Sequence, residues 1–584
     1  MRMARSGLLT VLAVSLMLAG CESAPEAPPP EPPKPETPAP KEPVQDLAWA
    51  AGQAPADACI VFTVASLGDL EANLKGLVGP DGEDMTIVDD IEKSLPSGAL
   101  DAAGPLVFIL PAGAEEMEPV MLLRVKDASA IKGEAAGAGI VEVECAEGGT
   151  VFVLAIDSWA MVAPDRAEAI KAILRAERKV ALSDAQRAAI AGHTAWVHLN
   201  PDSLVAAAKR FFDKAQKEMA ENPQGPKMPE ATMKMLYAVL TVAGDVDRIE
   251  AAADVKPQGI TADIEAEFDK ASDLFALAKS GVPVNDYKAG LPRAEGLILA
   301  AWAGMDWAKA IPPMKRLMKP IFDIIAEGED EKTRKAIDSM WASYEKWGAV
   351  MGNHFAMVME VPKPGAGLYQ FAETFTIKDP DQYRALLKEY METSMEAMDV
   401  MMSKFMTMPG MPQMPNVKGE TEYKEAAETV EGVPVDVWRI TFDVSLPPDT
   451  PPQAGKQLKD MLDTMYGPKG MEFRMAVVGN TAIATMGDPG VMARTLKAVK
   501  GEAPDLSTDP KVAAALKGIP KGQGAALVSA SNYIYLAMGM MDHMMTANLP
   551  PEVLAEAEKA GIKPLAPPPP ADFITFRLSA KEEA

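Results

Sequence analysis

Methionine is the residue type whose spacing most suggests chemistry in this chain. Among the 38 methionines, two groups are crowded, one between residues 391 and 414 and one between residues 538 and 545. Thioethers are soft ligands that suit Cu(I), and spacings of three or four residues place side chains on one helix face. The candidate ligands at such spacings are Met398, Met401, Met402, Met406, Met540, Met541, Met544 and Met545, together with His543. They predict a copper site.

Two other interpretations of the methionines stay open. Tyr383, Leu387 and Tyr390 begin an apolar stripe at helical spacing, which Met398, Met401 and Phe405 continue, so methionine can simply fill a core. The neighbouring Met402 and Met406 widen this stripe beyond one contact surface. A pliable groove for a hydrophobic ligand or a partner helix is therefore the third interpretation.

Sequence signatures of enzymes are largely missing. No H-E-x-x-H, C-x-x-C, G-x-S-x-G or phosphate-binding glycine loop occurs, and the S-x-x-K match at Ser129 and Lys132 lacks its companion motifs. His193 and His198 flank a short predicted strand at an odd separation, so they cannot share a metal. We expect His354 to be structural. These residues predict no catalytic centre, and an enzyme is the interpretation that we favour least.

The N-terminus has the parts of a secretion signal. Arg2 and Arg5 precede the apolar run Leu8–Leu18, which is too short to span a bilayer. The tetrad Leu18-Ala19-Gly20-Cys21 that follows resembles the lipobox of bacterial lipoproteins. The resemblance implies cleavage before Cys21 and attachment of acyl chains such as palmitate to this cysteine, which would anchor the protein durably to a membrane.

The same resemblance predicts where the protein is located. Glu22 follows the lipidated residue, and by the sorting rule of many Gram-negative lipoproteins the lack of Asp there favours the outer membrane. We expect the body to face the periplasm, with exposure at the cell surface as the alternative. An oxidising envelope permits a disulfide between Cys59 and Cys145, and two buried free thiols are the alternative.

Charge restricts the partners. The net charge of −26 excludes nucleic acid, whose phosphates require a basic surface. The expected partners are the membrane, through the acyl chains, and an unknown envelope protein or hydrophobic ligand. We expect no cofactor apart from the copper alternative.

Composition and periodicity predict the organisation of the chain. Residues 1–20 form a signal peptide, and residues 21–53 form a disordered proline-rich tether that favours polyproline II. Alternating strands and amphipathic helices then predict an α+β fold in two related tandem halves, 54–285 and 286–584, with antiparallel sheets and packed helices.

Internal similarity supports the two halves. Residues 56–77 are similar to 294–317, residues 158–192 to 480–518, and the hairpin predicted at 246–269 to one predicted at 353–377. The opening of each half resembles an uncharacterised family of secreted bacterial proteins, which implies an envelope location and no known activity. We therefore expect a lipid-anchored envelope protein of a non-enzymatic binding or scaffold type, with copper binding as the alternative.

Overall fold

The computed structural model describes residues 43–578 with gaps, the longest of which are 392–415, 446–458 and 537–572. The described residues form two compact units. Unit 1 contains those up to Ala215 and those of Ala243–Asp269, and unit 2 contains those of Gln216–Val242 and Lys270–Ala580.

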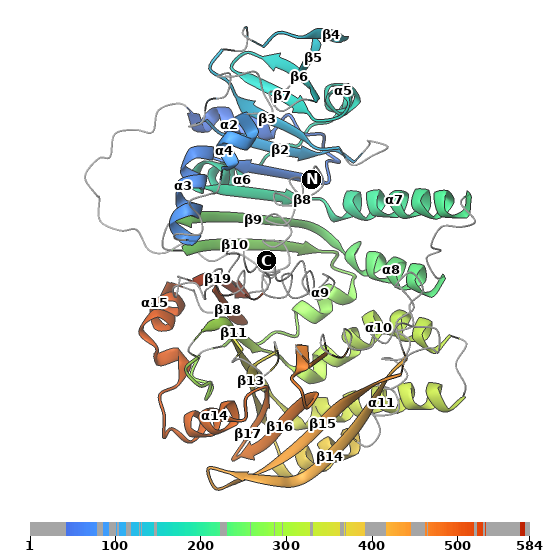
Figure 1. Ribbon diagram of the computed structural model, residues 1–584, viewed down its shortest axis with the longest axis vertical. Coiled ribbons are helices and arrows are strands. Elements are labelled where there is room, and N and C mark those ends of the chain that lie inside the picture. The colour runs from blue at the N-terminus through green and yellow to red at the C-terminus, as the bar shows by residue number, and fades with distance from the viewer. Residues whose placement is uncertain are drawn as a thin grey trace, which may run out of the picture. The chain divides into compact units, whose positions relative to one another are not determined.

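Unit 1 is built on an antiparallel sheet. Its strands are β1 (Ile60–Val64), β2 (Leu106–Leu110), β3 (Val120–Arg124), β4 (Glu134–Gly137), β5 (Ile140–Glu144), β6 (Thr150–Ile156), β7 (Trp159–Ala163), β8 (Ala195–Leu199), β9 (Val246–Lys256) and β10 (Gly259–Phe268). Neighbouring strands follow the order β4-β5-β6-β7-β3-β2-β1-β8-β9-β10, as Figure 1 shows. The predicted hairpin is confirmed, since Lys256 and Gly259 are cross-strand partners at its turn.

The helices of unit 1 are α2 (Pro43–Ala51), α3 (Leu67–Val78), α4 (Ile87–Glu92), α5 (Ala167–Arg175) and α6 (Asp184–Gly192), with α7 (Pro201–Glu221) beginning after β8. Helix α8 (Glu230–Ala243), which precedes β9 in the chain, lies almost entirely in unit 2. One face of the sheet packs against α2, α5 and α6 through a core that includes Leu47, Ile170 and Ile190. Helix α6 starts at a capping box, because the Ser183 and Gln186 side chains each bond the other residue's backbone.

Unit 2 is built on a second antiparallel sheet. Its strands are β11 (Leu297–Gly304), β12 (Met351–Glu360), β13 (Phe371–Ile377), β14 (Asn416–Val430), β15 (Val433–Ser445), β16 (Met471–Val478), β17 (Thr481–Met486), β18 (Gly524–Ser529) and β19 (Phe573–Leu578). They follow the order β14-β15-β16-β17-β13-β12-β11-β18-β19. Its helices are α9 (Asp273–Ala278), α10 (Trp307–Ala326), α11 (Glu331–Val350), α14 (Gly490–Lys500), the 3-10 helix η3 (Leu506–Thr508) and α15 (Pro510–Gly518).

The sheet of unit 2 has a core on each face, because alternate side chains of a strand point to opposite sides. On one face, Trp302, Ala356 and Ala372 pack with Val491 of α14 and Leu516 of α15. We call this the α14 face. On the opposite face, residues 380–391 are helical and pack with α11 over strands β13, β15, β16 and β17.

The two units share one topology. Renaming β1–β9 as β11–β19 converts the strand order of unit 1 into that of unit 2, and β10 is the one strand left over. Two of the predicted similarities fall at equivalent places, namely β1-α3 with β11-α10, and β7-α5-α6 with β17-α14-α15. The third is wrong, because β12–β13 occupies the place of β2–β3 and not that of β9–β10.

The structure thus confirms the predicted α+β class, with two related halves built on antiparallel sheets. The predicted disordered tether, 21–53, is wrong at its C-terminal end, because residues 43–51 form α2 and Leu47 packs in the core of unit 1. Among the described residues, no helix is both long enough and apolar enough to cross a membrane.

Candidate functional site

A cavity of about 580 Å³ opens on the α14 face of unit 2. Its floor is formed by cross-strand neighbours in the sheet. Trp302 of β11 is the cross-strand partner of Ala356 of β12, which is the partner of Thr374 of β13. The next row along the strands brings His354, Thr376 and Thr481 to the same face. We call this the basic cavity, for the charges described below.

The walls of the basic cavity are the loop 287–290 and the C-terminal end of α14. The buried Asp505 carboxylate holds the loop by accepting bonds from Ala289 N at 3.2 Å and from Gly290 N at 2.6 Å. Thr374 Oγ1 donates to the Ala289 carbonyl at 2.9 Å. Gly290 has a φ of +73°, and a Cβ there would lie 2.5 Å from a methyl carbon of Val499, so the loop approaches α14 as closely as only glycine allows.

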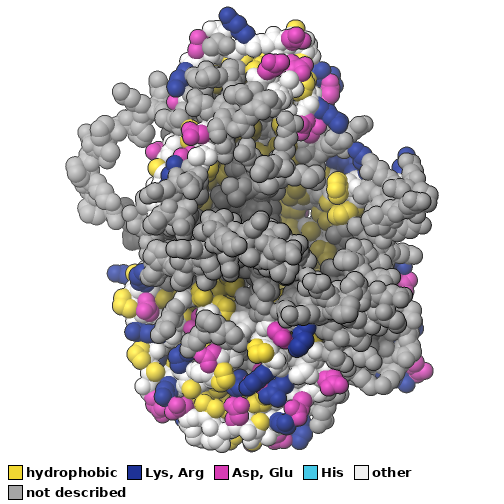
Figure 2. Space-filling model, viewed as in Figure 1, with side chains coloured by type: hydrophobic (Ala, Val, Ile, Leu, Met, Phe, Trp, Pro, Cys, Tyr) yellow, Lys and Arg dark blue, Asp and Glu magenta, His cyan; other side chains and the backbone are white. Residues whose placement is uncertain are grey.

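The charges around this cavity have one sign. Its lining includes Lys288, His354 and Lys500, and none of the described residues that line it is acidic. The whole chain carries 83 acidic and 57 basic side chains. Figure 2 shows both signs interspersed on the face of unit 2 that is in view. The described lining of the cavity, with basic and neutral side chains alone, therefore departs from the acidic composition of the chain.

Trp302 contributes an unusual polar atom to the floor. Its side chain is 2% exposed, and its Nε1 has no hydrogen-bond partner among the described residues. The ring of Tyr287 meets it edge to face at 5.6 Å. A buried N–H without an acceptor costs about 1–3 kcal/mol. Trp307 and Trp438 have the same defect, but they belong to the core on the opposite face.

At the corresponding place of unit 1, the described side chains of the sheet are buried. The rows on the matching face are Val61–Ile109–Val120 and Thr63–Val107–Leu122–Met161. Trp159 of β7 packs against Trp49 of α2, with ring centroids 6.4 Å apart. Helix α2 precedes β1, whereas the non-helical loop 287–290 precedes β11. The small Ala356 and Thr374 on β12 and β13, and a loop in place of a helix, thus leave space in unit 2.

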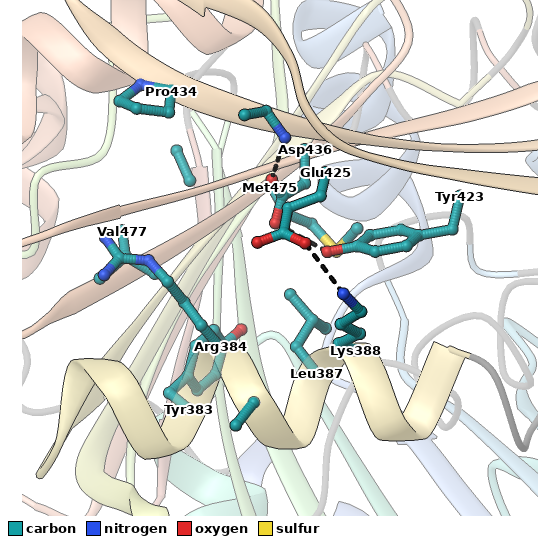
Figure 3. A pocket seen from close by; sticks show the side chains of 13 residues that line it. Tyr383, Arg384, Leu387, Lys388, Tyr423, Glu425, Pro434, Asp436, Met475 and Val477 are labelled. Carbon is teal, nitrogen blue, oxygen red and sulfur yellow. Dashed lines mark hydrogen bonds and ion pairs between the residues drawn. The ribbon is translucent and has the colours of Figure 1, made fainter.

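A second cavity, of about 370 Å³, lies on the opposite face of the same sheet (Figure 3). The helical residues 380–391 form one wall with Tyr383, Arg384 and Lys388, and strands β14–β16 form the other. We call this the paired cavity, because Tyr423 and Asp436, and Lys388 and Glu425, which line it, are bonded to each other.

The bonds of the paired cavity fix a bulge of β14. Tyr423 Oη donates to Asp436 Oδ2 at 2.9 Å, and the backbone N–H of Ala426 donates to Asp436 Oδ1 at 2.7 Å. Ala426 has a φ of +48° inside the bulge. Lys388 Nζ bonds Glu425 at 3.1 Å. Burial raises the pKa of Tyr423 above its ordinary value, and the bond to Asp436 adds to the shift. These bonds give Tyr423, Asp436, Lys388 and Glu425 a structural role in holding β14 in place.

Most sequence-predicted site residues lie outside the described residues. These are Cys21, Cys145, His543 and the methionines Met398, Met401, Met402, Met406, Met540, Met541, Met544 and Met545. Met391 is described and is 4% exposed, and it packs in the same core as Tyr383 and Leu387. The start of the methionine-rich stripe is therefore core.

Of the two alternatives for Cys59 and Cys145, a disulfide or two free thiols, the structure describes only Cys59, whose thiol is free and buried. Burial raises the pKa of the Cys59 thiol to about 11.

The other polar residues singled out from the sequence have local partners. Ser129 Oγ donates to Asp127 at 2.6 Å. The sequence pattern predicts a helix over residues 127–133, but described residues 131–133 are not helical. His193 Nδ1 lies 3.4 Å from Asp254, and His198 Nδ1 lies 3.3 Å from Glu250. His354, which we expected to be structural, lines the basic cavity. No motif could have revealed this, since the cavity joins residues from six separate segments.

Comparison of the chain with protein families, with curated proteins and with solved structures finds no match. Any function must therefore be argued from the site.

Proposed function

We propose that this is a non-enzymatic binding protein of the bacterial cell envelope, and that the basic cavity of unit 2 is its ligand-binding site. The observation that carries the proposal is the contrast between two units of one topology. The place that Leu122, Met161 and Trp159 fill in unit 1 is a cavity of about 580 Å³ in unit 2. Pockets for small organic ligands have volumes of about 300–1,000 Å³.

Binding suits the polar groups of this cavity better than catalysis does. A hydroxyl nucleophile needs a base within hydrogen-bond reach. Here Thr374 Oγ1 donates to the Ala289 carbonyl, and Thr376 Oγ1 accepts from His354 N and donates to His354 O. These hydroxyls are engaged with backbone groups, so they shape and orient the site.

The location is the other part of the proposal. The Leu18-Ala19-Gly20-Cys21 tetrad supports an acyl anchor, and the proline-rich segment after it supports a tether between the anchor and the body. A binding body held in this way would capture its ligand beside the membrane, at the periplasmic side of the outer membrane.

The test is to identify small molecules that copurify with the protein from its own envelope. Ala356 lies 1% exposed at the centre of the floor, so Ala356→Leu fills the cavity. We expect a compound released by denaturing the wild type, detected by mass spectrometry, to be absent from the variant. Ala385→Leu makes the same change in the paired cavity and should retain the compound. Equal extracts from the wild type and the Ala356 variant would contradict the proposal.

A further inference from the structure

We propose that the ligand of the basic cavity is a small organic anion with an apolar body, and this inference rests on the proposed binding function of that cavity. The anionic group would lie near Lys288, His354 and Lys500, and the apolar body would lie over the floor between Trp302 and Thr374. The class covers carboxylates, sulfonates and phosphate esters, which share a compact negative charge.

The charge of the site argues for an anion. Lys500 Nζ donates to the backbone carbonyl of Glu431 at 2.5 Å, a neutral acceptor that leaves the ammonium charge in place. The Glu431 carboxylate pairs with Lys497 instead, at 3.1 Å. On the other wall, the buried Asp505 is already bonded by Ala289 N, Gly290 N and the Ser507 hydroxyl. The Asp505 and Glu431 carboxylates are therefore bonded to groups other than Lys500.

A cationic ligand or a metal ion would find no counter-charge here. The described lining offers ammonium, imidazole and hydroxyl groups without a carboxylate. An acidic protein of net charge −26 repels anions at long range. Short-range cationic groups must therefore supply the attraction, and salt screens such exposed charges, so binding of the anion should weaken with ionic strength.

The apolar part of the lining argues for an organic body. Val284, Ala356, Ala498 and Val499 line the cavity together with the ring of Trp302. The indole Nε1 lacks a partner, and an acceptor atom on the ligand or on a trapped water would satisfy it. A free inorganic anion would leave these apolar walls uncovered.

Two matched probes separate charge from shape. 8-Anilinonaphthalene-1-sulfonate and N-phenyl-1-naphthylamine share one ring system, and only the first carries a sulfonate. The titration uses the chain from residue 21 onward with Cys21→Ser, so that neither acyl chains nor detergent compete for the probes. We expect the sulfonate to bind about tenfold or more tightly than the neutral probe, in keeping with the strength of charged hydrogen bonds.

Lysine variants test the source of this preference. Lys288→Gln with Lys500→Gln should weaken sulfonate binding about tenfold and leave the neutral probe unchanged. Neither lysine is buried, so the fold should be retained, which thermal unfolding checks. Lys319→Gln with Lys335→Gln removes the same charge from exposed positions on α10 and α11, and should change neither probe.

The outcomes distinguish the two proposals. Equal affinity for both probes, or an unchanged sulfonate affinity in the Lys288 and Lys500 double variant, would overturn the anion inference. If Ala356→Leu then still abolished binding of both probes, the cavity would remain a binding site. If Ala356→Leu altered neither probe in a chain that melts like its parent, the proposed function would fail as well.

Discussion

Cys59 shows how much the environment of a single residue can change its chemistry. Its side chain is fully buried at the start of β1, and its pKa is raised to about 11 because burial disfavours the thiolate. The thiolate is the reactive form of cysteine. The native thiol should therefore be inert.

We predict that Cys59 reacts with iodoacetamide at pH 8 at least about a hundredfold more slowly in the folded protein than in urea. The factor follows from a pKa shift from 9.0 to about 11, and lost access adds to it. A chain with Cys21→Ser and Cys145→Ser makes Cys59 the sole cysteine, so mass spectrometry reads it directly. Rapid modification without denaturant would show that β1 is not packed as described.

For single residues, the sequence predicts which side chains are buried better than it predicts which side chains form a site. Tyr383 and Leu387 were correctly placed in an apolar stripe, because helical spacing alone reveals a buried face. His354 and Thr374 could not be linked to one site. Their proximity depends on the register between β12 and β13, and no spacing along the chain encodes that register.

Among the elements, β8, β9 and α6 are joined by a buried polar cluster centred on Glu250. Its carboxylate accepts from Gln186 of α6, lies 3.3 Å from His198 of β8 and pairs with Arg248 at 3.3 Å. Burial by itself would raise the pKa of Glu250, but the bonds from His198 and Gln186 outweigh it, so the pKa lies below its ordinary value of 4.5.

We predict that Glu250→Gln destabilises the protein above pH 4.5 and less so below it. A carboxyl group with a lowered native pKa contributes stability above its unfolded pKa and loses that contribution as the pH falls through the native value. Urea unfolding of the wild type and the variant at pH 5 and pH 3 measures this. The gap between their midpoints should narrow at pH 3, and a constant gap would assign the effect to packing alone.

Most elements could be predicted because their patterns are local. The sequence pattern predicts helices at 165–177 and 184–191 and a hairpin at 246–269, and α5, α6 and the hairpin of β9 and β10 lie within a few residues of these bounds. The helix predicted at 127–133 failed for a local reason as well. Asp127 accepts bonds from both the backbone N–H and the hydroxyl of Ser129, a turn that competes with the first turn of a helix.

The whole molecule is a tandem of two units with one strand order. Segments that combine a strand and a helix, such as β7 with α5, kept a recognisable pattern in both units. The predicted similarity between the hairpins β9–β10 and β12–β13 was wrong. Alternation of apolar and polar residues occurs in any half-buried strand, so it cannot distinguish β9 from β12. Duplication followed by divergence would explain why buried side chains and α2 cover this face of the sheet in unit 1, whereas the α14 face of unit 2 has a cavity.

We predict that the mature protein begins at an acylated Cys21. Detergent phase partitioning and mass spectrometry of the N-terminal peptide test this, with Cys21→Ser as the matched variant. The wild type should enter the detergent phase, and the variant should stay in the aqueous phase because it cannot form the thioether. A native N-terminus that retains residues 1–20 would contradict the proposed envelope location. It would not affect the proposal that the basic cavity binds a ligand.

The most direct test of the central claim is to locate a bound anion. Crystals of the chain from residue 21 onward with Cys21→Ser, grown with 4-iodobenzenesulfonate, would place the iodine by its anomalous scattering. We predict an iodine site above Ala356, between β11–β13 and α14, with the sulfonate toward Lys288 and Lys500. Iodine sites confined to other surfaces at saturating concentration, with an empty floor at Trp302 and Ala356, would contradict the account.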